Sequence, residues 1–238
     1  FYAMMREQKE ISTSLANVED AIAFMEPYLK AEEDIFYIAF SSGLSGTCQA
    51  VMLAIEELKD KYPERKIYCV DSLAAALGEG LLVYYAFQNR ENGMTIEENV
   101  NWVEEHKLKL CHWFTVDDLF FLKRGGRISA ATAIVGTALK IKPVLHVDDE
   151  GHLIAMENVR GRKKAIHALV KKMQETIIEP EKQEIFISHG DCLEEAEYLA
   201  QKLKEALPVK NIMLNILDPV IGSHAGPGTL AVFFMGEH

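Results

Sequence analysis

The chain has 238 residues, 49% of them hydrophobic, and a formal net charge of -11 at neutral pH. This length and hydrophobicity allow one large core or two smaller ones, which excludes a disordered chain. The acidic balance argues against an extended nucleic-acid-binding surface, because the neutralisation of phosphates needs a basic face.

The sequence also gives no sign of a membrane span. Its apolar runs are all shorter than the roughly 20 residues that a transmembrane helix needs, and it shows no signal-peptide pattern. The cysteines Cys48, Cys69, Cys111 and Cys192 stand far apart, with no CxxC pair and no histidine at a metal-ligand spacing. This is typical of reduced thiols in a cytosolic protein. We therefore predict a soluble, cytoplasmic protein with no transmembrane segment, no metal and no cofactor.

Predicted strands and helices alternate along the chain, as in an α/β protein. The first ten residues, FYAMMREQKE, are helix-like and follow no initiator Met or leading strand, so we expect a missing N-terminal segment. Thr95 and Glu98 have the spacing of a capping box, which predicts a helix that starts at Ile96. The elements predicted up to residue 116 are strands at 35–40, 67–71 and 110–116 and helices at 48–59, 80–89 and 96–106.

The segment 117–142 differs from what precedes it, because a basic, glycine-containing break separates two short predicted helices. Ser129 is the predicted N-cap of the second helix. We place a domain boundary near Val116, which gives two α/β domains at residues 1–116 and 117–238. The elements predicted after the break are a hairpin with strands at 142–147 and 152–159, helices at 162–176 and 193–207, and strands at 184–188, 211–217 and 230–235.

The stretch SSGLSGT, at positions 41–47, lies between a predicted strand and a predicted helix. A helix N-terminus attracts anions, because its backbone NH groups and its dipole carry positive charge. The stretch lacks the lysine of a P-loop and the GxGxxG pattern of dinucleotide sites, which argues against a nucleotide. Alternatively, Ser41, Ser42 and Ser45 only cap the helix and satisfy the turn. The stretch alone therefore leaves both functions open.

A serine hydrolase of small esters is the catalytic alternative, because a nucleophile elbow also lies between a strand and a helix. The elbow pattern is GxSxG, whereas Ser45 stands in GLSG. Its base would be His224 or His189, oriented by Asp191 or Asp218. The incomplete motif weighs against this alternative.

Two further stretches bear on the site. GSHAGPGT is rich in glycine and interrupts two predicted strands, so it brings backbone close to a ligand, with His224 as a hydrogen-bond donor to an anion. LKRGGRIS concentrates Lys123, Arg124 and Arg127 in an otherwise acidic chain, as a bound phosphate or an acidic partner would require. Taken singly, such a histidine is more often structural and such a basic cluster is more often a solvated surface.

Together these stretches resemble the motifs of the DegV family of bacterial fatty-acid-binding proteins, which includes the FakB subunits of fatty acid kinase. Each motif is weak alone, but six occur in the family's order over essentially the whole chain. They are STS at 12–14, SSGLSGT at 41–47, VDS at 70–72 with GEGLLV at 78–83, LKRGGRIS at 122–129, RGRKKA at 160–165 and GSHAGPGT at 222–229.

The resemblance implies two α/β domains with a lipid-binding tunnel between them, which holds one long-chain fatty acid such as palmitate or oleate. Family members present the carboxylate to a separate kinase catalytic subunit, which makes the acyl phosphate for phospholipid synthesis, and they have no turnover of their own. By this resemblance we expect Lys123 and Arg124 to face the kinase. A regulatory sensor that releases a partner on binding would use the same pocket.

The resemblance also implies the residues of the carboxylate site. Thr13 and Ser45 match family positions that hydrogen-bond the carboxylate, and His224 matches a histidine near the same head group. Arg127 matches the arginine that closes the basic motif, and we expect it to supply countercharge near the carboxylate or near the transferred phosphate. The other loop residues expected beside the ligand are Ser14, Ser41, Ser42, Gly43 and Gly46.

The chain departs from the family pattern in two places. Leu15 and Ala16 follow the Thr-Ser pair, where the family usually has Gln-Pro, so the turn near Thr13 is expected to differ. Family members also begin with a strand and an Asp-Ser motif, so we expect about fifty residues and the first strand to be missing here.

Overall fold

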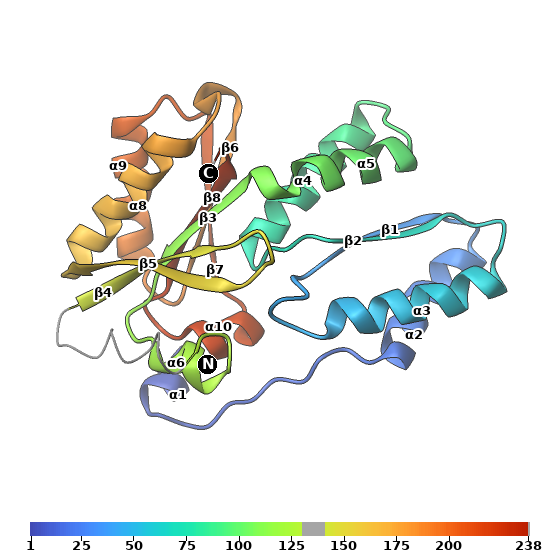
Figure 1. The fold of residues 1–238 in the computed structure, drawn as a ribbon, viewed down its shortest axis with the longest axis horizontal. Coiled ribbons are helices and arrows are strands. Elements are labelled where there is room, and N and C mark those ends of the chain that lie inside the picture. The colour runs from blue at the N-terminus through green and yellow to red at the C-terminus, as the bar shows by residue number, and fades with distance from the viewer. Residues whose placement is uncertain (130–140, 238) are drawn as a thin grey trace.

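The computed structural model describes residues 1–129 and 141–237 (Figure 1). The α/β class predicted from the sequence is confirmed, whereas the second short helix predicted after Ser129 lies outside the described residues. The first elements are α1 (Tyr2–Arg6), α2 (Val18–Lys30), β1 (Ile35–Ala39), α3 (Thr47–Lys61), β2 (Ile67–Asp71), α4 (Leu77–Glu91), α5 (Ile96–His106) and a 3-10 helix (Lys107–Lys109). The others are β3 (Leu110–Thr115), α6 (Phe120–Arg124), β4 (Ile141–Val147), β5 (Leu153–Arg160), α8 (Arg162–Thr176), a 3-10 helix (Pro180–Lys182), β6 (Glu184–His189), α9 (Leu193–Ala206), β7 (Asn211–Ile216), α10 (Pro219–Ala225) and β8 (Leu230–Met235).

The N-terminal unit is built on a two-stranded parallel sheet of β1 and β2. In Figure 1, α2 and α3 lie on one side of these strands, and α4 and α5 lie on the other. Met25, Leu29 and Leu58 are buried between α2, α3 and the sheet. The capping box predicted for α5 is confirmed, because Thr95 Oγ1 accepts a hydrogen bond from Glu98 N and the Glu98 carboxylate accepts one from Thr95 N.

The second sheet has six strands in the order β5-β4-β3-β8-β6-β7, and only the β6-β7 pair within it is parallel. Side chains alternate along β8, as the pleat of a strand requires. Leu230, Val232 and Phe234 belong to the core beneath α8 and α9, whereas Ala231 and Phe233 point to the opposite face. The alternation therefore gives the sheet one face buried under two helices and one face directed toward the N-terminal unit.

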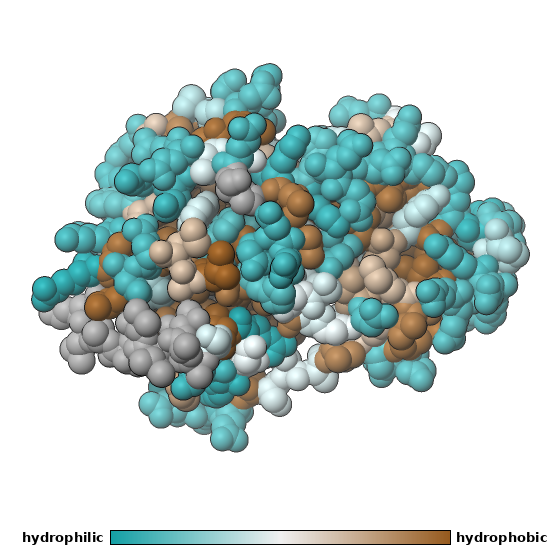
Figure 2. All heavy atoms as spheres, in the orientation of Figure 1, coloured by the Kyte–Doolittle hydropathy of each residue, from teal (hydrophilic) through white to brown (hydrophobic). Residues whose placement is uncertain are grey.

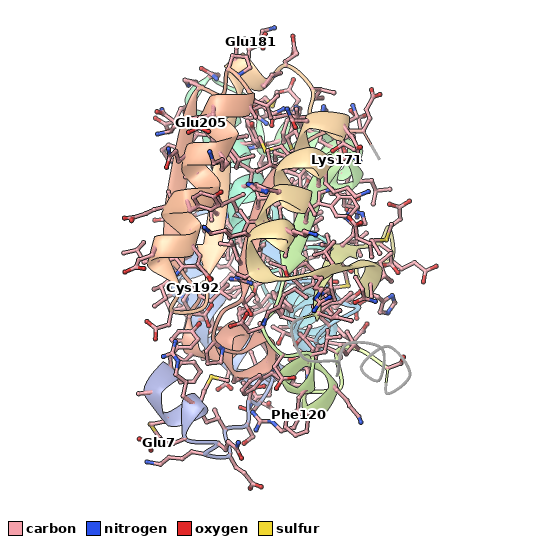
Figure 3. The ribbon with its side chains drawn as sticks, turned by 90° about the vertical axis from the view of Figure 1, so that its left-hand side faces the viewer. Glu7, Phe120, Lys171, Glu181, Cys192 and Glu205 are labelled. Carbon is pink, nitrogen blue, oxygen red and sulfur yellow. The ribbon has the colours of Figure 1, made fainter. Side chains whose placement is uncertain are left out.

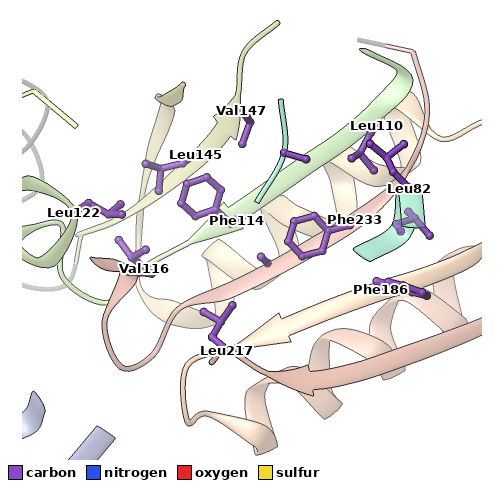
Figure 4. Packing of buried hydrophobic residues seen from close by; sticks show 14 of the residues in the cluster. Leu82, Leu110, Phe114, Val116, Leu122, Leu145, Val147, Phe186, Leu217 and Phe233 are labelled. Atoms are coloured by element: carbon purple, nitrogen blue, oxygen red, sulfur yellow. The ribbon is translucent and has the colours of Figure 1, made fainter. Parts of the chain in front are cut away.

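A shared hydrophobic cluster joins that second face to the N-terminal unit. Leu82 of α4 packs in the same cluster as Phe114 of β3, Phe186 of β6 and Phe233 of β8 (Figure 4). Full burial of a side chain of this size contributes roughly 1.5–3 kcal/mol.

The surface in the view of Figure 2 is mostly hydrophilic, with separate apolar patches.

The position of β3 bears on the predicted domain boundary. A boundary near Val116 groups β3 with the N-terminal elements, yet β3 is hydrogen-bonded to β4 on one side and to β8 on the other. A strand belongs with the sheet that satisfies its backbone groups. We therefore propose that the boundary lies between α5 and β3.

Candidate ligand-binding site

A cavity of about 1090 Å³ lies between the second face of the six-stranded sheet and the loops of the N-terminal unit. Its walls are largely apolar, which suits a ligand with a long hydrocarbon part. The apolar lining includes Phe40, Leu44, Phe114, Leu122, Val147, Leu153, Leu217, Ala231 and Phe233. The polar lining includes Thr13, Ser14, Ser45, Thr47, Arg124, Arg127 and His224.

Thr13 lies in the segment without regular structure that connects α1 to α2. α1 is attached to the C-terminal part of the chain, since the Tyr2 hydroxyl donates to Leu217 O at 2.9 Å and Arg6 forms an ion pair with Asp191. The segment thus passes along the cavity, where Thr13 Oγ1 lies 2.8 Å from Nε2 of His224. Two predicted site residues that are 211 positions apart are therefore in contact.

His224 lies on α10, which corrects the prediction that GSHAGPGT forms a loop. Residues 222–225 are helical, and the chain leaves the helix only at Gly226, whose φ is 85°. Asp218 caps the helix, because its carboxylate accepts hydrogen bonds from Val220 N at 2.7 Å and from Ile221 N. Asp218 followed by Pro219 is an N-cap signal in the sequence that the loop prediction did not use.

Ser45 lines the cavity just before α3. Its hydroxyl donates to Thr47 Oγ1 at 3.0 Å and accepts from Thr47 N at 3.2 Å. Leu44 O accepts a hydrogen bond from Arg127 Nε at 3.1 Å, so the loop is tied to the segment after α6. The predicted residues Ser14 and Gly46 also line the cavity.

The basic residues of LKRGGRIS have different positions. Arg127 lines the cavity and donates a hydrogen bond from Nη1 to Gly125 O. Arg124 also lines the cavity, and its Cζ lies 5.2 Å from the ring centroid of Phe121. Lys123 is exposed and is not among the described residues that line the cavity. A Cβ atom at Gly125 would lie 2.2 Å from His224 Nδ1, so only glycine lets the histidine ring lie this close.

His224 is surrounded in a way that favours its neutral form. Burial lowers its pKa below the ordinary value, and the positive charges of Arg127 and Arg124 lower it further. At neutral pH the ring therefore has one donor and one acceptor nitrogen. Thr13 can hydrogen-bond one nitrogen, as it does here at Nε2.

This environment predicts a pH effect on stability. Because the unfolded state binds the His224 proton more readily, the free energy of unfolding falls as the pH drops through about 6.5. His189, whose pKa burial also lowers, acts in the same direction, whereas Glu79, whose pKa burial raises to about 7, acts in the opposite one. We therefore expect wild type to lose more stability than a His224→Gln variant between about pH 7 and about pH 5. Thermal unfolding of both proteins across this range measures the difference, and parallel curves would contradict it.

The predicted residues Ser41, Ser42 and Gly43 do not line the cavity. The Ser41 hydroxyl is buried and donates to Gly151 O, and Ser42 N donates to the carboxylate of Asp71. These three residues therefore lie outside the described cavity lining. They hold the loop in place.

The hydrolase alternative requires Ser45 to be paired with His224 or His189, and the histidine to be oriented by Asp191 or Asp218. Within residues 1–129 and 141–237, none of these five side chains is hydrogen-bonded to another of the five. The geometry gives no support to a Ser-His-Asp hydrolase.

Within residues 1–129 and 141–237, no group of three or more His, Cys, Asp or Glu side chains is placed to hold a metal ion. No helix in this part of the chain is both long enough and apolar enough to cross a bilayer.

Which apolar residues line the cavity could not be predicted from the sequence. His112 of β3 also lines the cavity and was not predicted. It lies two residues before Phe114 and therefore on the same face of the strand. Period-two alternation can assign a residue to a face of a sheet. It cannot show whether that face meets a packed core or an open cavity.

A family model and a sequence relative both match nearly the whole chain. The family model described as "Uncharacterised protein, DegV family" matches residues 1–237. A DegV domain-containing protein of Clostridium perfringens is 49% identical over 237 residues, which cover 100% of this chain and 81% of the relative.

Two solved structures share the fold. The structure of a fatty-acid-binding DegV family protein from Thermus thermophilus has 32% identity and a TM-score of 0.87, over 99% of this chain and 82% of that one. The fatty acid kinase B3 protein of Streptococcus pneumoniae, loaded with linoleic acid, has 22% identity and a TM-score of 0.88, over 98% of this chain and 82% of that one. Because its sequence identity is only 22%, the similarity to the second structure shows a shared fold and nothing more.

Proposed function

Because the chain belongs to the DegV family, we propose that it binds one long-chain fatty acid in the cavity between its six-stranded sheet and the loops of the N-terminal unit. One observation carries the proposal: a large, mostly apolar cavity that is also lined by hydroxyl, imidazole and guanidinium groups, among them the hydrogen-bonded pair of Thr13 and His224. A fatty acid has the matching chemistry, since it combines a long hydrocarbon chain with one small anion.

The hydrocarbon chain would supply most of the affinity. At about 0.8 kcal/mol for each buried methylene, the chain of palmitate contributes on the order of 10 kcal/mol before ordering costs are subtracted. The walls formed by Phe114, Ala231 and Phe233 provide the apolar surface for this burial.

The carboxylate would lose several kcal/mol on leaving water unless it found replacement hydrogen bonds. We propose that the hydroxyls of Thr13 and Ser45 donate to it, and that the Nε2–H of neutral His224 donates to Thr13 Oγ1 and so orients the Thr13 hydroxyl toward the carboxylate. Arg127 supplies positive charge nearby, and the N-terminus of α3 adds the helix dipole. Small hydroxyl groups leave a carboxylate oxygen free to accept a phosphoryl group. A direct lysine salt bridge would hinder that transfer.

Titration calorimetry with palmitate and with oleate, on protein freed of lipid, tests this function. We expect one binding site per chain for the preferred acid. Absence of binding for both acids, in protein that remains folded, would contradict the proposal.

We further propose that the protein has no turnover and presents the carboxylate to a separate kinase, as the family resemblance implies, in the cytoplasm. Lys123 is exposed beside the cavity-lining Arg124 and does not itself line the cavity. This is where a docking residue for an acidic partner surface would lie.

We expect Lys123→Glu to slow kinase-dependent phosphorylation of bound palmitate at least tenfold while leaving palmitate affinity within twofold of wild type, since a like charge now faces the partner. Lys171→Glu is the matched control, because Lys171 is exposed on α8 at the opposite end of the view in Figure 3 from Phe120 of α6. Equal phosphorylation rates for the two variants would refute the docking role.

A further inference from the structure

The residues that precede Ser45 contact the turn between β4 and β5. The buried Ser41 hydroxyl donates to Gly151 O at 2.9 Å, and Gly43 N donates to the same hydroxyl at 3.2 Å. β1 and α3, which flank Ser41 and Gly43, belong to the N-terminal unit, whereas Gly151 lies in a turn of the six-stranded sheet. One hydroxyl therefore links the two units.

The approach of these two segments is close enough to require glycine on both sides. A Cβ atom at Gly43 would lie 2.8 Å from Glu150 O and 2.9 Å from Gly151 O. A Cβ atom at Gly151, whose φ is 79°, would lie 2.1 Å from Ser41 Oγ. Any side chain at either position must therefore push the segments apart or turn the Ser41 hydroxyl away from its acceptor.

The loop after β2 completes the contact. The Asp71 carboxylate accepts from Ser42 N at 3.2 Å and from Leu73 N at 3.1 Å, and Ser41 N donates to Ala74 O. Leu73 has a φ of 52°, which is unfavourable for a bulky side chain and persists only where the surroundings hold it. The loop is therefore held by several independent bonds.

We propose that Ser41, Gly43 and Gly151 form a latch that positions the Ser45 loop at the cavity. Val147 and Leu153, on either side of the β4-β5 turn, line the same cavity, so the latch lies at the edge of that cavity. The three residues act through Ser45 and are positioning residues. This inference rests on the proposed fatty-acid function and deepens it.

The test compares Gly43→Ala and Gly151→Ala with Gly93→Ala. Gly93 has a φ of 90°, similar to that of Gly151, but a Cβ there would meet nothing described within 4 Å. It therefore controls for left-handed backbone strain without a clash. Ser41→Ala is the fourth variant, because it keeps both glycines and removes only the hydroxyl.

Affinity is measured for palmitate and for hexadecanol, which has the same chain but no carboxylate. We expect the two clashing variants and Ser41→Ala to bind palmitate about tenfold more weakly and hexadecanol within about twofold of wild type, because a displaced loop affects only the head group. Gly93→Ala should match wild type for both probes. Equal losses for palmitate and hexadecanol would overturn the latch in favour of a merely structural role.

Hydrogen exchange of the lipid-free proteins gives a readout that does not depend on binding. We expect faster exchange over residues 42–47 in the three latch variants than in wild type or Gly93→Ala. Unchanged exchange there would overturn the latch. If wild type binds no palmitate, the fatty-acid function fails, and the exchange rates still decide whether the latch exists.

Discussion

Replacement of Arg127 with glutamine is expected to weaken palmitate binding about thirtyfold, which corresponds to about 2 kcal/mol. Arg127 lines the cavity and is held there by hydrogen bonds to Leu44 O and Gly125 O, so its charge is fixed beside the proposed carboxylate site. A charge-assisted contact of this kind is worth more than a neutral one. Calorimetric titration of variant and wild type measures the change.

Arg90→Gln is the matched control, because Arg90 is exposed on α4 and is not among the described cavity-lining residues. It should leave the affinity unchanged. The palmitate affinity of Arg127→Lys should lie between those of Arg127→Gln and Arg90→Gln, since lysine keeps the charge but loses the Nε bond. Hexadecanol, which has no carboxylate, should bind Arg127→Gln almost as well as wild type. An unaltered palmitate affinity would remove Arg127 from the carboxylate site.

Replacement of Ala231 with phenylalanine is expected to reduce the affinity for palmitate and oleate more than a hundredfold. Ala231 is buried on β8 and lines the cavity on the same face as Phe233. A phenyl ring there would occupy the space of about four methylenes of the acyl chain, at a cost of about 3 kcal/mol. A shorter acid such as octanoate, which reaches less deeply, should lose less affinity.

The control for this variant is Ala155→Phe, which places the same side chain on β5, where Ala155 is exposed. It should bind palmitate as wild type does. Thermal unfolding of both variants separates a blocked cavity from a damaged core, because overpacking costs stability as well as space. If Ala231→Phe stayed folded and bound palmitate normally, the acyl chain would have to lie elsewhere.

Much of the local structure could be predicted from the sequence, because its causes are local. The Thr95 and Glu98 capping box started α5 as expected, and the alternation at 110–116 and the apolar run at 230–235 marked β3 and β8 as strands. The site residues Thr13, Ser45, Arg127 and His224 were identified through the family resemblance. The structure places all four around one cavity.

Long-range relations could not be predicted in the same way. The pairing of β3 with β4 and β8 depends on contacts between distant segments that no local pattern encodes. The same holds for Ser41, whose hydroxyl bonds Gly151, 110 positions away. Ser41 of the SSGLSGT stretch therefore joins two units, and its partner is visible only in three dimensions.

The most direct test of the account is denaturing solvent extraction of the purified protein, followed by mass spectrometry of the extracted molecules. We predict one long-chain fatty acid at near-stoichiometric yield, and its loss from protein carrying Ala231→Phe. An extract without lipid, together with no uptake of added palmitate or oleate, would contradict the account and show that the family fold is present here without its ligand.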